Sequence, residues 1–182
     1  MISNHLTCNR RRILVASLAG STGFLAAATA SAQNPRSSGE HAMNGLEITN
    51  AVNRIAILSD LRNWDAVRAC FTEQVHVDYT SLTGGESETI AANALVEQWK
   101  SVFESTFKTT QHLLGSHSIT ITGDSATCLS HFQARHVPLD PTKSVWTLGG
   151  YYTHKLVKQN NQWLVEAMTM VWTWEEGERP FA

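Results

Sequence analysis

From Thr109 onwards the chain is built of four long runs of strand-type sequence, and three turn signals separate them. These signals are Gly123-Asp124, the loop from Pro138 to Pro141, and Asn160-Asn161, which suits a two-residue hairpin. The expected strands cover residues 109–122, 125–137, 144–158 and 162–174. Because long antiparallel strands twist and curl, we expect a curved sheet whose concave face needs a cover.

The sequence before these strands has helical spacing, and the helices it predicts would cover the concave face. Apolar residues recur at helical intervals from Ile48 to Arg62, a second short helix begins after a cap at Asn63, and a third covers residues 90–107. Residues 74–80 alternate with period two, which indicates a strand with Tyr79 on its apolar face. We therefore predict an α+β fold, in which a cone-shaped, curled antiparallel (mixed) sheet and three N-terminal helices enclose a pocket.

The first 32 residues have the layout of an export signal. Arg10, Arg11 and Arg12 precede an apolar stretch rich in Ala, Gly, Ser and Thr, and this segment contains no acidic residue. The run resembles the twin-arginine signal of bacterial exporters, and an ordinary secretory signal is the alternative. We expect cleavage after Ala32, a disordered tether over 33–45, one domain over 46–182, and a periplasmic or secreted location.

Composition narrows the choice of partners. Without residues 1–32 the chain has 11 Lys and Arg against 16 Asp and Glu, a net charge of −5, which argues against nucleic acid and against an anionic membrane. Cys70 and Cys128 would lie in a compartment that permits a disulfide, and the sequence leaves open whether they meet. No Cys/His cluster has zinc spacing, so we expect neither a metal nor another cofactor.

Four polar residues stand where the lining of an apolar pocket is expected: Asp60, Tyr79, His112 and His136. An imidazole titrates near neutral pH, so it can take a proton from a carbon beside a carbonyl and return it to a departing hydroxyl. A buried carboxylate fixes the tautomer of such a histidine, and a phenol can donate to the developing enolate oxygen. Together these groups suit elimination of water, or isomerisation, next to a carbonyl.

The segments around these residues resemble scytalone dehydratase and its bacterial relatives. The likeness extends over about residues 46–175 and rests on Asp60 with Asn63-Trp64-Asp65, Val77 to Ser81, Thr110 to Leu113, Gln133 to His136, and the late tryptophans. The chain is similar in this way to the SnoaL-like group of the nuclear-transport-factor-2-like superfamily, which has a cone-shaped α+β barrel. That superfamily also contains non-enzymes, so the fold alone does not fix the function.

The resemblance implies a role for each matched residue. His112 would be the general base and acid, Tyr79 would polarise the substrate carbonyl through water, and His136 would pair with Asp60. His131 lies five positions before His136 and on the opposite side of the strand, so at most one of the two faces the pocket.

The chain departs from this family at positions expected to contact substrate. Ser59 stands where the family has a second tyrosine before the aspartate, and Gly150 and Tyr152 replace its serine and asparagine. Tyr152 either supplies the lost phenol from the other wall or simply fills the cavity. Trp99 is a candidate for the ligand-binding wall, whereas most other aromatic residues fit the core or a subunit contact.

Three functions fit these observations. The first is a cofactor-independent lyase or isomerase acting on a small, largely apolar, cyclic hydroxy-carbonyl compound. The second is a non-catalytic module that binds a small hydrophobic ligand in the same pocket, and the third is a structural subunit like the small subunit of ring-hydroxylating dioxygenases. An apolar outer sheet face attributed to Trp146, Leu148, Trp172 and Trp174 predicts a homo-oligomer, a dimer or a trimer.

Overall fold

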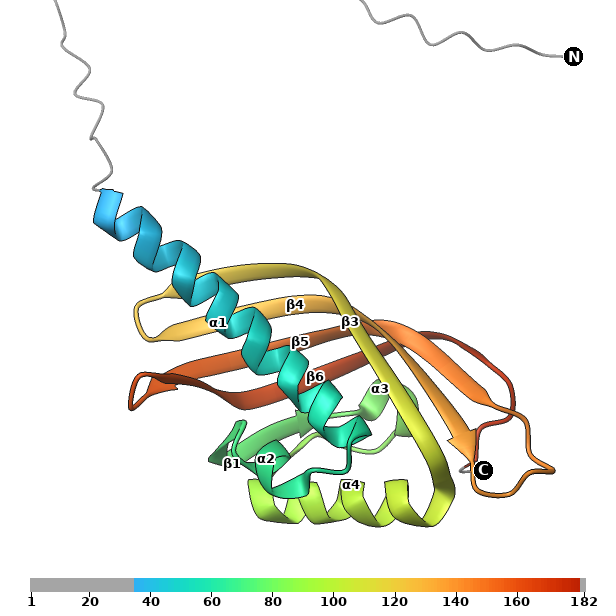
Figure 1. The fold of residues 1–182 in the computed structure, drawn as a ribbon. Coiled ribbons are helices and arrows are strands. Elements are labelled where there is room, and N and C mark those ends of the chain that lie inside the picture. Colours follow the sequence, from blue (N-terminus) through green and yellow to red (C-terminus); the bar gives the residue numbers. More distant parts are fainter. Residues whose placement is uncertain (1–34, 181–182) are drawn as a thin grey trace, which may run out of the picture. The chain divides into compact units, whose positions relative to one another are not determined.

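A computed structural model describes residues 35–180, and its main feature is one curved six-stranded sheet (Figure 1). The strand order is β2-β1-β6-β5-β4-β3. The strands are β1 Phe71–Asp78, β2 Glu88–Ala91, β3 Phe107–Thr122, β4 Ser125–Pro138, β5 Trp146–Gln159 and β6 Gln162–Glu176. Neighbouring strands are antiparallel except β1 and β6, which are parallel, so the sheet is mixed and open. The α+β class predicted from the sequence is confirmed.

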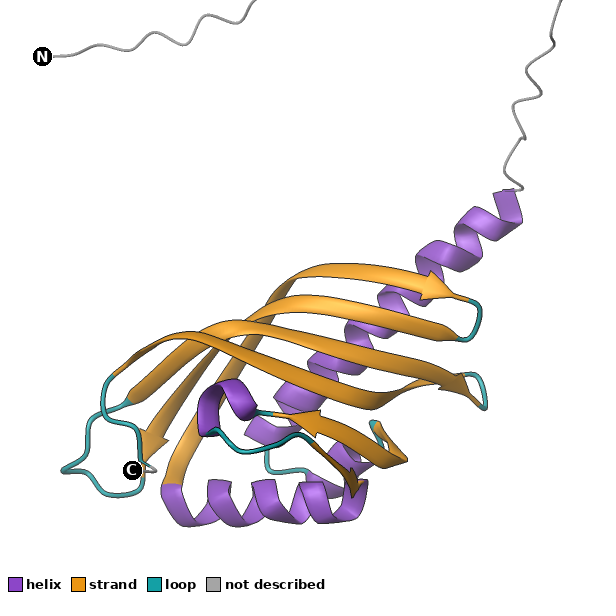
Figure 2. Cartoon of the chain, turned by 180° about the vertical axis from the view of Figure 1, so that it is seen from behind, coloured by secondary structure: helices purple, strands orange, loops and turns teal. Residues whose placement is uncertain are grey.

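Helices cover one face of this sheet. They are α1 Pro35–Asp60, α2 Trp64–Arg68, α3 Thr80–Thr83 and α4 Ala92–Thr106. α1 packs along β3, β4 and β6, while α4 lies against β1, β2 and β3 (Figures 1 and 2). α1 does so because Ile48, Val52 and Ile55 form one fully apolar, buried stripe. Within residues 35–180, no helix is long and apolar enough to cross a membrane.

Strict alternation in β4 explains how the sheet obtains an inner face. Every second residue from Ala126 to His136 is buried, and the residues between them are exposed. The open question of which histidine of β4 faces inward is thereby answered, because His136 is buried and His131 is exposed. The expected hairpin at Asn160-Asn161 is also present, with both residues at positive φ, 50° and 64°.

The first helix is longer than the sequence predicts. Residues 35–45, expected to be a disordered tether, form the first turns of α1. Asn44 Oδ1 accepts hydrogen bonds from Lys158 Nζ at 2.9 Å and from Trp163 Nε1 at 3.4 Å, so contacts with the sheet hold this part of the helix. Composition alone does not reveal such a contact. The expected signal peptide lies outside the described residues.

Two further expectations need correction, and one strand was not anticipated. Tyr79 is not part of the strand but follows β1 and precedes α3, because the chain turns there. Trp146 and Leu148 do not form an outer face, since each is 3% exposed and packs in the inner core with Phe107 and Met170. The short strand β2 was not anticipated, since four residues are too few to show a period.

Candidate functional site

Two adjoining pockets that share lining residues lie between the helices and the inner face of the sheet, and we call the larger one the outer chamber and the smaller one the inner chamber. The outer chamber has a volume of about 430 Å³ and the inner chamber about 90 Å³. Both chambers are lined by the same five residues at their boundary, Tyr79, Trp99, Phe103, His112 and Tyr152. The outer chamber is otherwise lined mainly by apolar side chains, so a bound ligand would be largely removed from water.

His112 and Asp60 form a hydrogen-bonded pair beside this boundary. Asp60 is the last residue of α1, and its Oδ1 lies 2.7 Å from His112 Nδ1 on β3. The other carboxylate oxygen accepts the backbone N–H of His112 at 2.7 Å. Both oxygens of Asp60 therefore hold the same residue, which fixes the orientation of the imidazole ring.

The protonation of this pair follows from its surroundings. Burial raises the pKa of Asp60, but hydrogen bonds from His112 and Thr110 and the charge of His112 outweigh it, and the net effect lowers the pKa. Asp60 is therefore a carboxylate at neutral pH and accepts the proton on His112 Nδ1. In the neutral ring, Nε2 then carries the lone pair, on an imidazole that lines both chambers.

A second layer of contacts supports the carboxylate. Thr110 Oγ1 donates to Asp60 Oδ1 at 2.7 Å, and Arg62 Nη1 donates to Thr110 Oγ1 at 2.9 Å. Arg62 also donates to the backbone oxygen of Ser59 at 2.9 Å, and its guanidinium lies 4.8 Å from the centre of the Phe103 ring. The arginine therefore ties the end of α1 to β3.

His136 lies near this pair. Contrary to the prediction from the sequence, it makes no hydrogen bond to Asp60. Its ring centre lies 5.3 Å from that of His112, at a right angle, and it packs at 4.7–4.8 Å against Phe107 and Trp146. Burial, together with the nearby His112, lowers the pKa of His136 to about 3, so this ring is neutral. Asp60 pairs with His112 instead, and its further hydrogen bond comes from Thr110, the neighbour of His136 across the strand pair.

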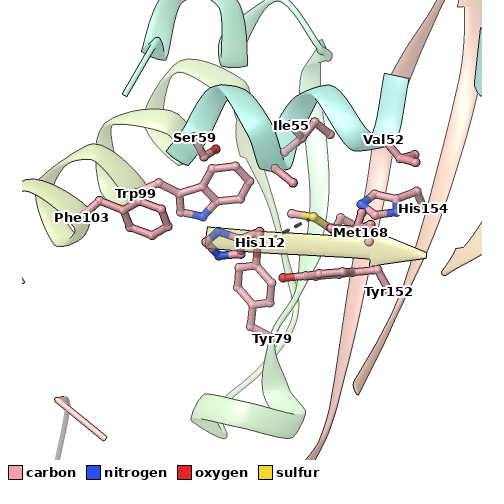
Figure 3. A pocket seen from close by; sticks show the side chains of 12 residues that line it. Val52, Ile55, Ser59, Tyr79, Trp99, Phe103, His112, Tyr152, His154 and Met168 are labelled. Carbon is pink, nitrogen blue, oxygen red and sulfur yellow. Dashed lines mark hydrogen bonds between the residues drawn. The ribbon is translucent and has the colours of Figure 1, made fainter. Parts of the chain in front are cut away.

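Two phenols complete the boundary between the chambers. Tyr79 and Tyr152 both turn toward His112 in the cavity (Figure 3), and Tyr79 Oη is 3.8 Å from Met168 Sδ. Burial raises the pKa of both phenols, so they remain protonated and can act as donors. Tyr152 thus brings a second phenol to the cavity from β5, the wall opposite the position at which Ser59 replaces a tyrosine.

The other residues singled out in the sequence also border the cavity. Trp99 on α4 lines both chambers, and Ser59 on α1 lines the inner one. Sequence reasoning missed Arg62, Thr110 and His154, of which His154 lines the inner chamber. Thr110 could have been found, since period two puts it on the same face of β3 as His112.

Cys70 and Cys128 are both buried and free, which answers the question of a disulfide between them for this structure. Burial raises the pKa of the Cys128 thiol to about 11, so neither its reactivity nor its position suggests a nucleophile. In the stretch from 35 to 180, no group of three or more His, Cys, Asp or Glu side chains could hold a metal ion.

Comparison with known families gives one match. The model of the SnoaL-like domain matches residues 40–169. The comparison with curated proteins gave no match.

Comparison with solved structures gives many matches of the same fold. The Kfla4162 protein of Kribbella flavida is 24% identical over 75% of this chain and 95% of its own, with a TM-score of 0.70. A candidate scytalone dehydratase from Novosphingobium aromaticivorans is 18% identical over 80% of this chain and 94% of its own, with a TM-score of 0.71. LinA type 2, a hexachlorocyclohexane dehydrochlorinase, is 8% identical over 79% and 95%, with a TM-score of 0.67. At these identities the likeness establishes the fold alone.

Proposed function

Because the chain belongs to the SnoaL-like domain family, we propose that it is a cofactor-independent lyase or isomerase that uses His112 as both base and acid. The substrate is a small, largely apolar, cyclic hydroxy-carbonyl compound. The observation that carries this proposal is the hydrogen bond that His112 Nδ1 donates to Asp60 Oδ1, beside a cavity of ligand size. Fold relatives that are dehydratase-like enzymes support the same reaction type.

Proton removal is the first step. His112 Nε2 takes a proton from the carbon beside the substrate carbonyl, and the electrons of that C–H bond move toward the carbonyl oxygen. Tyr79 and Tyr152 are the donors that stabilise the resulting enolate oxygen, since both are protonated and buried. The imidazolium that forms is stabilised by the Asp60 carboxylate.

Loss of the hydroxyl group completes an elimination. The enolate electrons form the carbon–carbon double bond, the C–O bond breaks, and the proton on His112 Nε2 goes to the departing hydroxyl to give water. If the proton returns to another carbon instead, the result is an isomerisation. Neither outcome changes the oxidation state of the substrate as a whole, so no redox cofactor is required.

His136 acts as an uncharged neighbour of the base. Its neutral ring avoids the repulsion that a second imidazolium would exert on His112 when the latter accepts a proton. His136 lines the outer chamber and packs against Phe107 and Trp146, and these contacts restrain its ring. We assign it a substrate-positioning role.

The direct test is elimination from cyclic β-hydroxy ketones such as 3-hydroxycyclohexanone, followed by the ultraviolet absorbance of the enone. His112→Ala should lower turnover by about 10²–10⁴-fold, because general acid–base catalysis is lost. His131→Ala is the matched control, since His131 is exposed on the other face of the sheet. Equal activity of the wild-type protein and His112→Ala on a substrate that both turn over would contradict the proposal.

A second candidate function is a non-catalytic module that binds a small hydrophobic ligand. The mainly apolar lining of the outer chamber favours it, since such a surface binds apolar rings without any chemistry. The two functions differ in the effect of His112→Ala. In an enzyme this variant loses most of its turnover. In a binding module it scarcely changes ligand affinity, which falls only when bulky residues near Tyr79 fill the cavity.

We further propose that the chain is exported to the periplasm or beyond, with cleavage after Ala32. Support comes from the sequence: Arg10 to Arg12 precede an apolar stretch that ends in the small residues Ala30-Ser31-Ala32. Replacing Arg10 and Arg11 by lysine should keep the chain in the cytoplasm with an uncleaved mass. Export of this double variant would point to an ordinary secretory signal.

A further inference from the structure

Arg62 lies at a backbone position where arginine is unusual. Its φ is 58°, in the left-handed region, directly after the last turn of α1. Its backbone N–H donates to the oxygen of Ser59, and the N–H of Asn63 donates to the oxygen of Leu58. This pair of hydrogen bonds is the Schellman motif, which most often has glycine at the left-handed residue because glycine has no Cβ. The turn alone therefore does not explain an arginine side chain here.

The guanidinium of Arg62 is held by two aromatic rings and a hydroxyl group. Its central carbon lies 4.8 Å from the centre of the Phe103 ring and 6.0 Å from that of Trp64. Nη1 donates to Thr110 Oγ1 at 2.9 Å, and Nη2 is inaccessible to solvent. Arginine is not deprotonated in proteins, so a positive charge is held in place next to Thr110.

The contact with Thr110 gives the hydrogen bonds of the site a direction. Arginine is only a donor, so Thr110 Oγ1 accepts from Arg62 and turns its own hydrogen toward Asp60 Oδ1, 2.7 Å away. Asp60 Oδ1 also accepts from His112 Nδ1, and Oδ2 accepts the backbone N–H of His112. One hydroxyl group therefore links Arg62 to the carboxylate that orients the base.

The balance of charge decides whether His112 is free to accept a proton. A carboxylate bonded to an imidazole favours the imidazolium, and a histidine that is already protonated cannot act as a base. With Arg62 present, the charges of Arg62 and Asp60 cancel, so a proton on His112 adds an unbalanced positive charge. Without the charge of Arg62, the same proton would neutralise the carboxylate of Asp60 and would bind more readily.

The titratable side chains closest to His112 on the other elements carry no charge. Tyr79 and Tyr152 are protonated because burial raises the pKa of both phenols. Burial and the nearby His112 lower the pKa of His136 most, and Arg62 adds to the same shift. The charge of Arg62 therefore acts on an imidazole of this site.

The carboxylates around the site are exposed. Glu88 lines the outer chamber, and Glu104 on α4 accepts a hydrogen bond from Trp64 Nε1 at 2.8 Å. Water screens both side chains, so they offset the charge of Arg62 only in part. Arg62 is thus the cation that is linked by hydrogen bonds to Asp60.

We propose that Arg62 is a positioning residue whose positive charge, linked to Asp60 through Thr110, keeps His112 neutral and able to accept a proton near pH 7. The inference rests on the proposed function, because it explains how a histidine bonded to a carboxylate remains a base. It gives Arg62 a role that closing the end of α1 does not require.

The test compares the wild-type protein with Arg62→Gln and Arg62→Lys by proton NMR over a range of pH. Glutamine keeps a hydrogen-bond donor without the charge, whereas lysine keeps the charge. The ring signals of His112 are identified by their absence from His112→Ala. In Arg62→Gln they should change at a pH about one unit higher than in the wild-type protein, as loss of a nearby unit charge predicts. Arg62→Lys should follow the wild type.

Arg68→Gln is the matched control. Arg68 is the next arginine of the chain and is also half-buried, but its side chain contacts Asn93 and Glu73. This variant should follow the wild type, and Thr110→Val should shift the His112 signals in the same direction as Arg62→Gln. Circular dichroism verifies folding, and Thr110→Val carries the test if Arg62→Gln does not fold.

Two results would overturn the inference. The first is an Arg62→Gln protein in which the His112 signals change at the same pH as in the wild type. The second is an Arg62→Lys protein that shifts as far as Arg62→Gln, since the charge would then not be the cause.

The titration does not depend on turnover, so it separates this inference from the proposed function. Exchange of the protons beside the carbonyl of 1-indanone in heavy water measures the chemistry of His112. A shifted titration in Arg62→Gln without exchange in the wild type supports the role of Arg62 and counts against the enzyme. Exchange with the same dependence on pH in both proteins supports the enzyme and overturns the inference.

Discussion

At the scale of single residues, the sequence predicted that Asp60 has a histidine partner, but it named the wrong histidine: Asp60 bonds to His112 and not to His136. From residue chemistry and the family resemblance, the sequence predicted that Asp60, His112 and His136 form one site. Which histidine contacts the aspartate depends on where α1 ends relative to β3. That position is set by a turn in which Arg62 has a φ of 58°, and local sequence patterns do not encode its direction.

The neutral state of His136 gives a prediction for stability. The pKa of histidine is about 6.5 in an unfolded chain and about 3 for His136 in the fold, so below pH 6.5 the unfolded state binds the proton first. The free energy of unfolding should therefore fall with decreasing pH, by up to about 1.4 kcal/mol per pH unit from this residue between pH 6.5 and 3. His136→Phe, which suits the surrounding aromatic rings, should remove this contribution.

Urea unfolding followed by tryptophan fluorescence at pH 7, 6, 5 and 4 measures the effect. The curve of His136→Phe against pH should be flatter than that of the wild-type protein, while His131→Gln should follow the wild type. Parallel curves for wild type and His136→Phe would show that the folded His136 ring accepts a proton as readily as the unfolded one.

At the scale of elements, the four long strands could be predicted to within two residues because alternation of burial is visible directly in the sequence. The extension of α1 to Pro35 could not be, and its contact between Asn44 and Lys158 joins residues that lie far apart in the chain. Tyr79 was assigned to a strand for a different reason. Its side chain continues the apolar face of β1, although the backbone has already turned.

The irregularity between Gly149 and Gly150 gives a prediction at this scale. The register of β5 and β6 shifts there, and a Cβ atom at Gly150 would overlap the backbone oxygen of Val171. Gly150→Ala should therefore lower the free energy of unfolding by about 1–3 kcal/mol, as overpacking does. Gly115→Ala on β3 is the control, because its Cβ would meet nothing within 4 Å, and it should be neutral or stabilising by about 0.5 kcal/mol. Chemical denaturation of both variants measures the difference, and equal stabilities would contradict this explanation of the glycine.

At the scale of the whole molecule, a curled sheet covered by helices could be predicted, whereas the division of the cavity into two chambers could not. The side chains of Tyr79, Tyr152 and His112 line both chambers, and they come from the turn after β1, from β5 and from β3. Their meeting also explains the reaction proposed above, since donors and base converge where the chambers join.

The outer face of the sheet gives a prediction about assembly. Leu113, Leu129 and Tyr151 are 56%, 43% and 37% exposed, and they replace the buried Trp146 and Leu148 as the apolar surface to be covered. We expect a dimer or a trimer through this face. Light scattering should give a multiple of the chain mass for the wild-type protein and a smaller mass for Leu129→Lys with unchanged circular dichroism. A monomeric wild type would rule the assembly out.

The central claim is that His112 moves a proton to and from a carbon beside a carbonyl. Proton NMR of 1-indanone in heavy water tests this most directly, because exchange at that carbon needs the base and no leaving group. The account predicts enzyme-dependent loss of the signal of these protons with the wild-type protein and His131→Ala, and almost none with His112→Ala. Equal exchange in all three proteins, or line broadening without exchange in any of them, would contradict it.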